Sequence, residues 1–80
     1  MGGMSIDKSK YDKIYKQLGR NIRKARKVCR ISQEELAFSI SSARNYIGCI
    51  ERAEKAPSIA MVCEIAAALN IKVQDLFQDI

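Results

Sequence analysis

Residues 32–52 carry the pattern that decides the fold, and they read SQEELAFSISSARNYIGCIER. Ser32 stands three residues before Glu35, which is the spacing of a capping box, in which hydroxyl and carboxylate each accept a backbone N–H at a helix start. The residues that follow place apolar side chains on one helical face: Leu36, Ala37 and Ile40. A short helix is therefore predicted to begin directly after Ser32.

The segment Ser39–Ser42 ends this helix, because short hydroxyl side chains compete for backbone hydrogen bonds. The apolar pattern then restarts at Tyr46, Ile47 and Ile50, which predicts a second short helix over about residues 43–52. Two short helices joined by a tight turn are expected here, with Ile47 and Ile50 facing inward.

A longer helix is predicted ahead of this pair, over about residues 9–29. Its apolar side chains recur at spacings of three and four: Tyr11, Ile14, Leu18, Ile22 and Ala25. Ser9, with Asp12 three residues later, can cap its start.

Two further helices are predicted after the pair. Pro57 marks a stop, Ser58 can cap a helix over about residues 59–69, and Asn70 tolerates the left-handed conformation that ends helices. A short helix follows near residues 73–77. No stretch alternates with period two, so the whole chain is expected to be all-α with five helices.

The 80 residues suffice for one domain, expected over residues 9–80 after a flexible segment 1–8. The net charge of +5 is unevenly distributed: residues 1–30 hold ten Lys/Arg and two Asp, net +8, whereas residues 31–80 hold four Lys/Arg and seven Asp/Glu, net −3. A basic half suits a polyanion such as nucleic acid, although a solvated basic helix face would give the same charge.

The sequence shows no pattern for metal, membrane or enzyme chemistry. Three Cys and no His occur, without a C-x-x-C pair, which argues against a zinc site and favours free thiols in a reducing cytoplasm. No apolar run approaches the roughly 20 residues that span a bilayer. Without a glycine-rich phosphate loop or a nucleophile beside a base, we expect no catalytic site, cofactor or small-molecule substrate.

Short motifs between residues 18 and 77 occur in a fixed order: Leu18, Ile22, Arg23, Arg26, Ser32–Ala37, Tyr46-Ile47, Ile50–Arg52, Pro57-Ser58, Ile65-Ala66, Ala68-Leu69 and Asp75–Phe77. In this order and spacing they resemble the Cro and phage-repressor type of helix-turn-helix domain, the XRE family. The resemblance implies a lambda-repressor-like five-helix fold that places the helix over residues 43–52 in the major groove of double-stranded DNA.

The outward face of that helix is then expected to read bases: Ala43, Arg44, Asn45, Gly48 and Cys49. Arg44 can make a bidentate contact with guanine and Asn45 with adenine, with a phosphate contact as the alternative for Arg44. Gly48 leaves room for a close approach to the bases. Cys49 could touch a thymine methyl group, sit partly buried without a role, or respond to oxidants.

Phosphate contacts are expected from five residues: Ser32, Gln33, Tyr46, Arg52 and Lys55. Gln33 begins a helix, where free amide groups and the helix dipole favour an anion. The resemblance implies that Gln33 also buttresses the recognition helix. For Tyr46, packing of the ring alone is the alternative.

Arg26 and Glu51 resemble the pair that ties the first helix to the third in this family. A bidentate arginine–carboxylate pair would hold the recognition helix at its angle.

The turn before the recognition helix departs from the family pattern. Ser41 stands where glycine or asparagine is usual, Ser42 where an apolar residue is usual, and Ala43 where a hydroxyl N-cap is usual. Either a serine caps a helix that begins earlier, which shifts the register of the reading residues by about one position, or the turn is locally weak.

The helix over residues 59–69 is apolar on nearly all sides, with Glu64 as its only charge. A homodimer interface is expected from this helix and the last segment: Ala60, Met61, Val73, Leu76, Phe77 and Ile80. Two recognition helices would then lie about 34 Å apart, which matches a palindromic site. The alternative is that the last short helix covers this surface within one chain.

These expectations describe a cytoplasmic transcriptional regulator, expected to be a repressor that binds a palindromic operator as a homodimer. Phage-type repressors, restriction–modification controllers and antitoxins all fit. The competing interpretation is a protein-interaction module that kept the fold but binds DNA without sequence preference, which the irregular turn and the apolar helix would support.

Overall fold

A computed structural model describes residues 8–80, which form four α-helices and two 3-10 helices and, within that range, no strand. In chain order these are η1 (Lys8–Tyr11), α1 (Asp12–Val28), α2 (Gln33–Ser39), α3 (Arg44–Glu51), α4 (Ile59–Ala68) and η2 (Val73–Phe77). The predicted all-α class is confirmed, with η2 as the fifth helix. The flexible segment expected over residues 1–8 falls, apart from its last residue, outside the described part of the chain.

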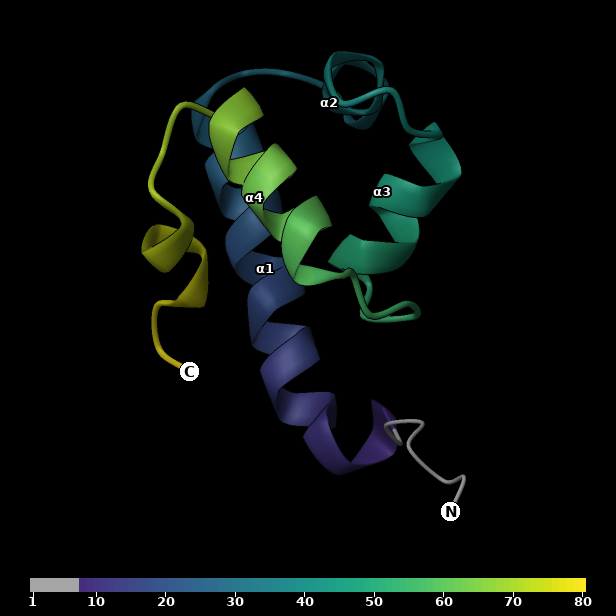
Figure 1. Ribbon diagram of the computed structural model, residues 1–80, viewed down its shortest axis with the longest axis vertical. Helices are drawn as coiled ribbons and strands as arrows, with labels where there is room; N and C mark the ends of the chain where they lie inside the picture. The colour runs from purple at the N-terminus through teal and green to yellow at the C-terminus, as the bar shows by residue number, and fades with distance from the viewer. Residues whose placement is uncertain (1–7) are drawn as a thin grey trace.

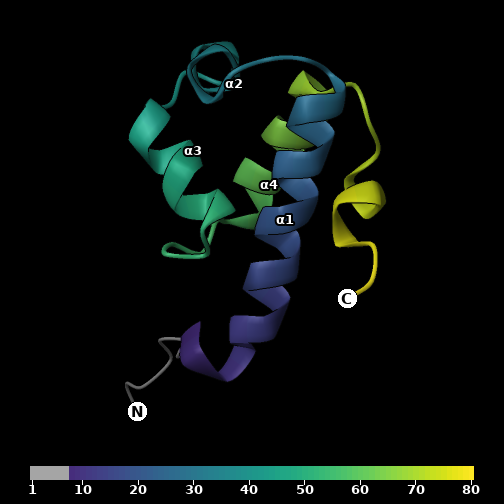
Figure 2. The same ribbon diagram turned by 180° about the vertical axis from the view of Figure 1, so that it is seen from behind.

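The long helix α1 organises the arrangement of the others. Figure 1 shows α2 beyond the C-terminal end of α1 and α3 on one side of it, and Figure 2, from behind, shows η2 on the opposite side of α1 from α3. η2 packs on both α1 and α4, and α3 packs on both α1 and α2. Among residues 8–80, no helix is long and apolar enough to cross a membrane.

One core joins four helices and η2. Its fully buried large side chains come from every one of these elements: Ile22, Leu36, Ile47, Ile50, Val62, Ile65 and Leu76. Burying one such side chain contributes about 1.5–3 kcal/mol to stability. The orientation of α3, which supplies Ile47 and Ile50, is therefore fixed by the same core that holds the domain together.

The predicted caps of α2 and α4 are confirmed. Ser32 Oγ accepts the backbone N–H of Glu35 at 3.0 Å, and Glu35 Oε1 accepts the N–H of Ser32 at 2.7 Å, which completes the capping box. Ser58 Oγ accepts the N–H of Met61 at 3.0 Å at the start of α4. Asn70, with φ of 57°, follows α4 in the left-handed conformation.

The α-helix α1 begins later than the predicted residue 9. The chain first passes through the 3-10 turn η1, so the α-helix begins only at Asp12, and its N-cap residue is Tyr11. Tyr11 makes no side-chain cap hydrogen bond. Asp12 forms an i,i+4 ion pair with Lys16 at 3.0 Å.

The turn between α2 and α3 follows a glycine-like path without a glycine. Ser41 has φ of 54°, in the left-handed region that a residue with a β-carbon seldom adopts. α3 begins at Arg44 after the N-cap residue Ala43, which supplies no side-chain acceptor. Neither Ser41 nor Ser42 caps an earlier helix start, so the register of Arg44 and Asn45 is the one that the family pattern implies.

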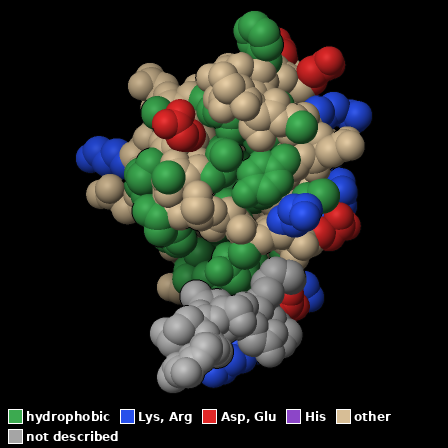
Figure 3. Space-filling view, turned by 45° about the vertical axis from the view of Figure 1, so that its right-hand side comes forward, with side chains coloured by type: hydrophobic (Ala, Val, Ile, Leu, Met, Phe, Trp, Pro, Cys, Tyr) green, Lys and Arg blue, Asp and Glu red, His purple; other side chains and the backbone are tan. Residues whose placement is uncertain are grey.

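The residues expected at a dimer interface separate into three groups by burial. Leu76 was expected there wrongly, because its side chain is fully buried in the core of its own chain and is closed to a partner. Met61, Val73 and Phe77 are half-buried against the same core, whereas Ala60 and Ile80 are exposed. Figure 3 shows that hydrophobic side chains gather in its left and lower part and continue down to the grey terminus. The chain thus covers part of this apolar surface and leaves part of it open.

Gly19 lets the backbone of α1 lie in direct contact with the backbone at the end of α3. A Cβ at this position would lie 2.6 Å from the carbonyl oxygen of Glu51 and 2.7 Å from that of Ile50. Both atoms belong to the backbone at the end of α3, so no side-chain rotation could relieve the overlap. The glycine therefore sets how close the end of α3 lies to α1.

Gly19→Ala is expected to destabilise the domain by about 1–3 kcal/mol in urea unfolding, because the end of α3 must move away from α1. The matched control is Gly48→Ala, where the added Cβ would meet only the ends of flexible side chains, Arg52 Nη1 at 3.0 Å and Gln33 Oε1 at 3.6 Å. This control should stabilise the helix by about 0.5–1 kcal/mol. A Gly19→Ala variant as stable as the wild type would contradict the backbone contact.

Candidate nucleic-acid interface

The short helix α3 has an inner and an outer face. Ile47 and Ile50 are 0% and 1% exposed, in the core shared with α1, α2 and α4. Ala43, Arg44 and Asn45, at the opposite side and the start of the helix, are exposed. The packing residues and the predicted reading residues therefore lie on different faces, as a helix-turn-helix requires.

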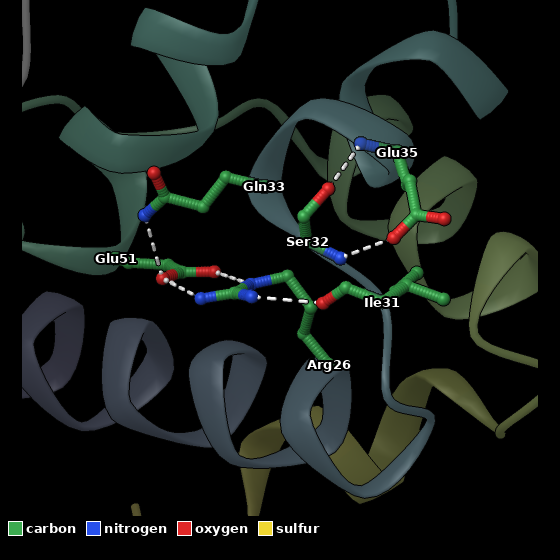
Figure 4. A network of polar contacts seen from close by, with 6 residues as sticks. All are labelled: Arg26, Ile31, Ser32, Gln33, Glu35 and Glu51. Atoms are coloured by element: carbon green, nitrogen blue, oxygen red, sulfur yellow. Dashed lines mark hydrogen bonds and ion pairs between the residues drawn. The ribbon is translucent and has the colours of Figure 1, made fainter.

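A buried ion pair fixes the end of α3 to α1. Arg26 Nε donates to Glu51 Oε2 at 2.7 Å and Arg26 Nη2 donates to Glu51 Oε1 at 3.0 Å, so the pair is bidentate (Figure 4). The two side chains are only 9% and 2% exposed. Arg26 Nη1 also donates to the carbonyl oxygen of Ile31 at 2.9 Å, in the link between α1 and α2. One guanidinium thus joins α1, the link between α1 and α2, and α3.

Gln33 connects α2 to the same pair. Its Nε2 donates to Glu51 Oε1 at 3.0 Å, while its Oε1 lies near the position that a Cβ of Gly48 would occupy. Figure 4 shows Gln33 and the Ser32–Glu35 capping box side by side above the Arg26–Glu51 pair. The amide of Gln33 therefore supports α3 directly, and Glu51 receives hydrogen bonds from two different helices.

A shallow hollow at the surface brings together residues expected to read bases and residues expected to hold phosphate. It is lined by Arg26, Ser32, Gln33, Glu34 and Arg44. Ser32 and Arg44 are exposed and Gln33 is half-buried. The start of α2 and the start of α3 thus present one continuous polar surface.

Arg52, the C-cap residue of α3, has a carboxylate partner that the sequence analysis did not identify. Its Nε and Nη2 donate to Glu54 Oε2 and Oε1 at 2.9 and 3.2 Å. Hydrogen bonds from Arg52 lower the pKa of the Glu54 carboxyl, and those to Glu54 raise the pKa of Arg52. Ala53, with φ of 61°, turns the chain back so that these two side chains meet. Helical periodicity gives no signal for such a contact.

Gly48 does not lie open on the outward face as expected, because it is buried. Its neighbours are the side chains of Arg52 and Gln33, which lie over the place where its own side chain would be. Of the other predicted contact residues, Tyr46 and Cys49 are half-buried, and Lys55 is exposed just after α3.

The family model for helix-turn-helix proteins matches residues 22–76. The chain belongs to this family, of the Cro and phage-repressor type. Among the curated relatives of this helix-turn-helix protein is the control protein C.SmaI of Serratia marcescens, which is 37% identical over 59 residues, covering 74% of this chain and 70% of that protein.

Solved structures show the same fold. The restriction-modification controller protein C.AhdI from Aeromonas hydrophila superposes with a TM-score of 0.77 at 33% identity, covering 79% of this chain and 96% of that one. The clp gene regulator ClgR from C. glutamicum gives a TM-score of 0.76 at 25% identity, covering 79% and 82%. The names of these relatives describe regulatory proteins: a control protein, a restriction-modification controller and a gene regulator. The helix-turn-helix chain is accordingly a DNA-binding regulator and not an enzyme.

Glu51→Ala is expected to destabilise this helix-turn-helix domain by about 3–5 kcal/mol, measured by urea unfolding, because it leaves the buried Arg26 charge without its partner. The double variant Arg26→Met, Glu51→Leu keeps similar volume without charge and should regain most of that stability. If Glu51→Ala unfolds at the same urea concentration as the wild type, the pair does not hold α3 in place.

Proposed function

We propose that this protein is a sequence-specific transcriptional repressor that binds a twofold-symmetric operator as a homodimer, with α3 in the major groove. The observation that carries the proposal is the exposure of Arg44 and Asn45 at the start of α3, on a helix whose other side is locked into the core by Ile47 and Ile50. A helix-turn-helix reads DNA with this part of its second helix.

The exposed start of α3 is assigned to direct contacts with the bases. Arg44 is assigned to a guanine, through two parallel hydrogen bonds to O6 and N7, and Asn45 to an adenine through N6 and N7. Ala43, which is exposed and apolar, and Cys49, which is half-buried one turn along, suit thymine methyl groups. Gly48 is left out of this set because it is covered.

Phosphate contacts flank the reading face on both sides. Ser32 and Gln33 lie beside Arg44, and Gln33 keeps one amide hydrogen for a phosphate while the other binds Glu51. Lys55 and the hydroxyl of Tyr46 supply the remaining contacts. Such contacts fix the position of the protein on the duplex without selecting sequence.

A second copy of the chain is assigned to the outer face of α4. Its exposed residues are apolar apart from Glu64: Ile59, Ala60, Cys63, Ala67 and Ala68. Ile59 is 69% exposed and also lines an apolar hollow with Tyr11, Ile14 and Phe77, which continues the face towards the start of α1. Apolar surface that is continuous over two helices favours a protein partner, and twofold symmetry lets one patch cover its own copy.

The relatives support a proposal for the class of regulated gene. Two of them are named as control proteins, one explicitly of restriction and modification, so this protein is proposed to control such genes from the cytoplasm. The competing function, a protein-interaction module without sequence preference, is separated from this one by the first experiment below.

Selection of bound sites from a random duplex pool should yield a site with two inverted half-sites. Arg44→Ala should then relax preference at one base pair in each half-site by about 1–3 kcal/mol. Lys55→Ala is the matched control, because loss of a phosphate contact weakens binding to every sequence alike and lowers the salt slope by about one. Weak, equal binding of the wild type to all sequences would favour the interaction module instead.

Ala60→Glu should shift the protein from dimer to monomer in sedimentation at micromolar concentration, since the exposed position needs no refolding and the new charge would be buried between copies. Val28→Glu is the control, because Val28 is an apolar residue, 75% exposed on α1 outside this face. A wild type that sediments as a monomer at high micromolar concentration, with and without operator DNA, would remove the dimer.

A further inference from the structure

Gly48 is an unusual residue for the middle of a short recognition helix. Glycine is among the least favourable residues in a helix interior, and α3 is only eight residues long. The position is buried by the guanidinium of Arg52, whose Nη1 lies 3.0 Å from the point where a Cβ would be. The missing side chain makes the space in which this guanidinium lies.

The position of Arg52 along α3 places its charge on the reading face. Arg44, Gly48 and Arg52 are spaced by four residues, so they follow one another on the same side of the helix. Helical side chains lean back towards the N-terminus, and that of Arg52 returns by one turn to cover Gly48. Its guanidinium therefore lies next along this face from Arg44, at the middle of α3.

Glu54 holds the guanidinium in this orientation by one of its edges. The Nε–H and one Nη2–H donate to the two carboxylate oxygens, which is the fork geometry of a bidentate pair. The two side chains are 57% and 55% exposed, and a pair so exposed adds little to stability. Its effect is therefore on orientation, since it restricts the rotation of a long side chain.

The other edge of the guanidinium is available to a ligand. Nη1 has no hydrogen-bond acceptor among residues 8–80. The second hydrogen of Nη2 makes only a long contact, of 3.9 Å, to Cys49 Sγ. These two nitrogens can donate in parallel to O6 and N7 of guanine. The carboxylate beside them opposes a phosphate, which would bring a second negative charge close to Glu54.

We propose that Arg52 is a second base-reading residue, specific for guanine, and that Glu54 and Gly48 are its positioning residues. This replaces the phosphate contact expected for Arg52 from the sequence. The inference rests on the proposed function, because it assigns one more base pair in the half-site that α3 reads.

The test compares sites selected from random duplexes, and the salt dependence of binding, for the wild type and Arg52→Lys. Lysine keeps the charge but lacks the fork. Guanine preference should fall on the order of tenfold or more at one base pair per half-site, next to the pair that Arg44→Ala affects, while the salt slope stays unchanged. Preference that is unchanged at every base pair would make Arg52 a phosphate contact and overturn the proposal.

Glu54→Ala tests the positioning residue. The released guanidinium should bind any nearby phosphate, so guanine preference at the same base pair should fall. Binding to random DNA should become tighter, and its affinity should depend more steeply on salt concentration. Asp79→Asn is the matched control, because it removes one exposed carboxylate at the C-terminal end and asparagine tolerates its φ of 64°. If the two variants behave alike, Glu54 does not position Arg52.

Gly48→Ala gives an independent readout, since it should make the domain more stable and yet reduce guanine preference at this same base pair. A wild type that selects no sequence would overturn the proposed function together with this inference. A wild type whose preference depends on Arg44 but not on Arg52 would overturn this inference alone.

Discussion

The carboxylate of Glu51 is the point on which the orientation of the reading helix depends. It lies in the last turn of α3, almost without exposure, and receives two hydrogen bonds from Arg26 of α1 and one from Gln33 of α2. A buried carboxylate needs all of these donors, because an unpaired charge in the interior is costly. Three helices are thereby brought into one relative position, and Gly19 lets the backbones of α1 and α3 come close together.

Most of the positive charge and the residues proposed to read bases lie on different helices. Most of the basic half of the sequence lies along α1, where the following residues are exposed: Lys13, Lys16, Arg20, Arg23, Lys24 and Lys27. The outer face of α3 adds Arg44 and the Arg52–Glu54 pair, whose charges offset each other. Long-range attraction to a polyanion therefore comes chiefly from α1, whereas the groups proposed to discriminate between bases lie on α3.

The sequence predicted the elements well where local rules govern. The capping box at Ser32 and the N-cap at Ser58 gave helix starts that the structure confirms, because these signals act within four residues. The Arg26–Glu51 pair came only from the resemblance, since nothing local relates residues 25 positions apart. Leu76 was misplaced because an apolar side chain gives the same signal whether it faces its own core or a partner. The Arg52–Glu54 contact was missed because it depends on the left-handed Ala53, which no periodic pattern marks.

The two ends of α3 are held very unequally. The last turn is tied by the Glu51 carboxylate and by the backbone approach at Gly19, whereas the first turn follows Ser41 in a strained conformation and starts at Ala43 without a side-chain cap. Amino-acid replacements at the exposed residues 43–45 consequently meet little structural resistance. Under the proposed function, descendants of this chain can change their DNA target there by single mutations that leave the fold intact.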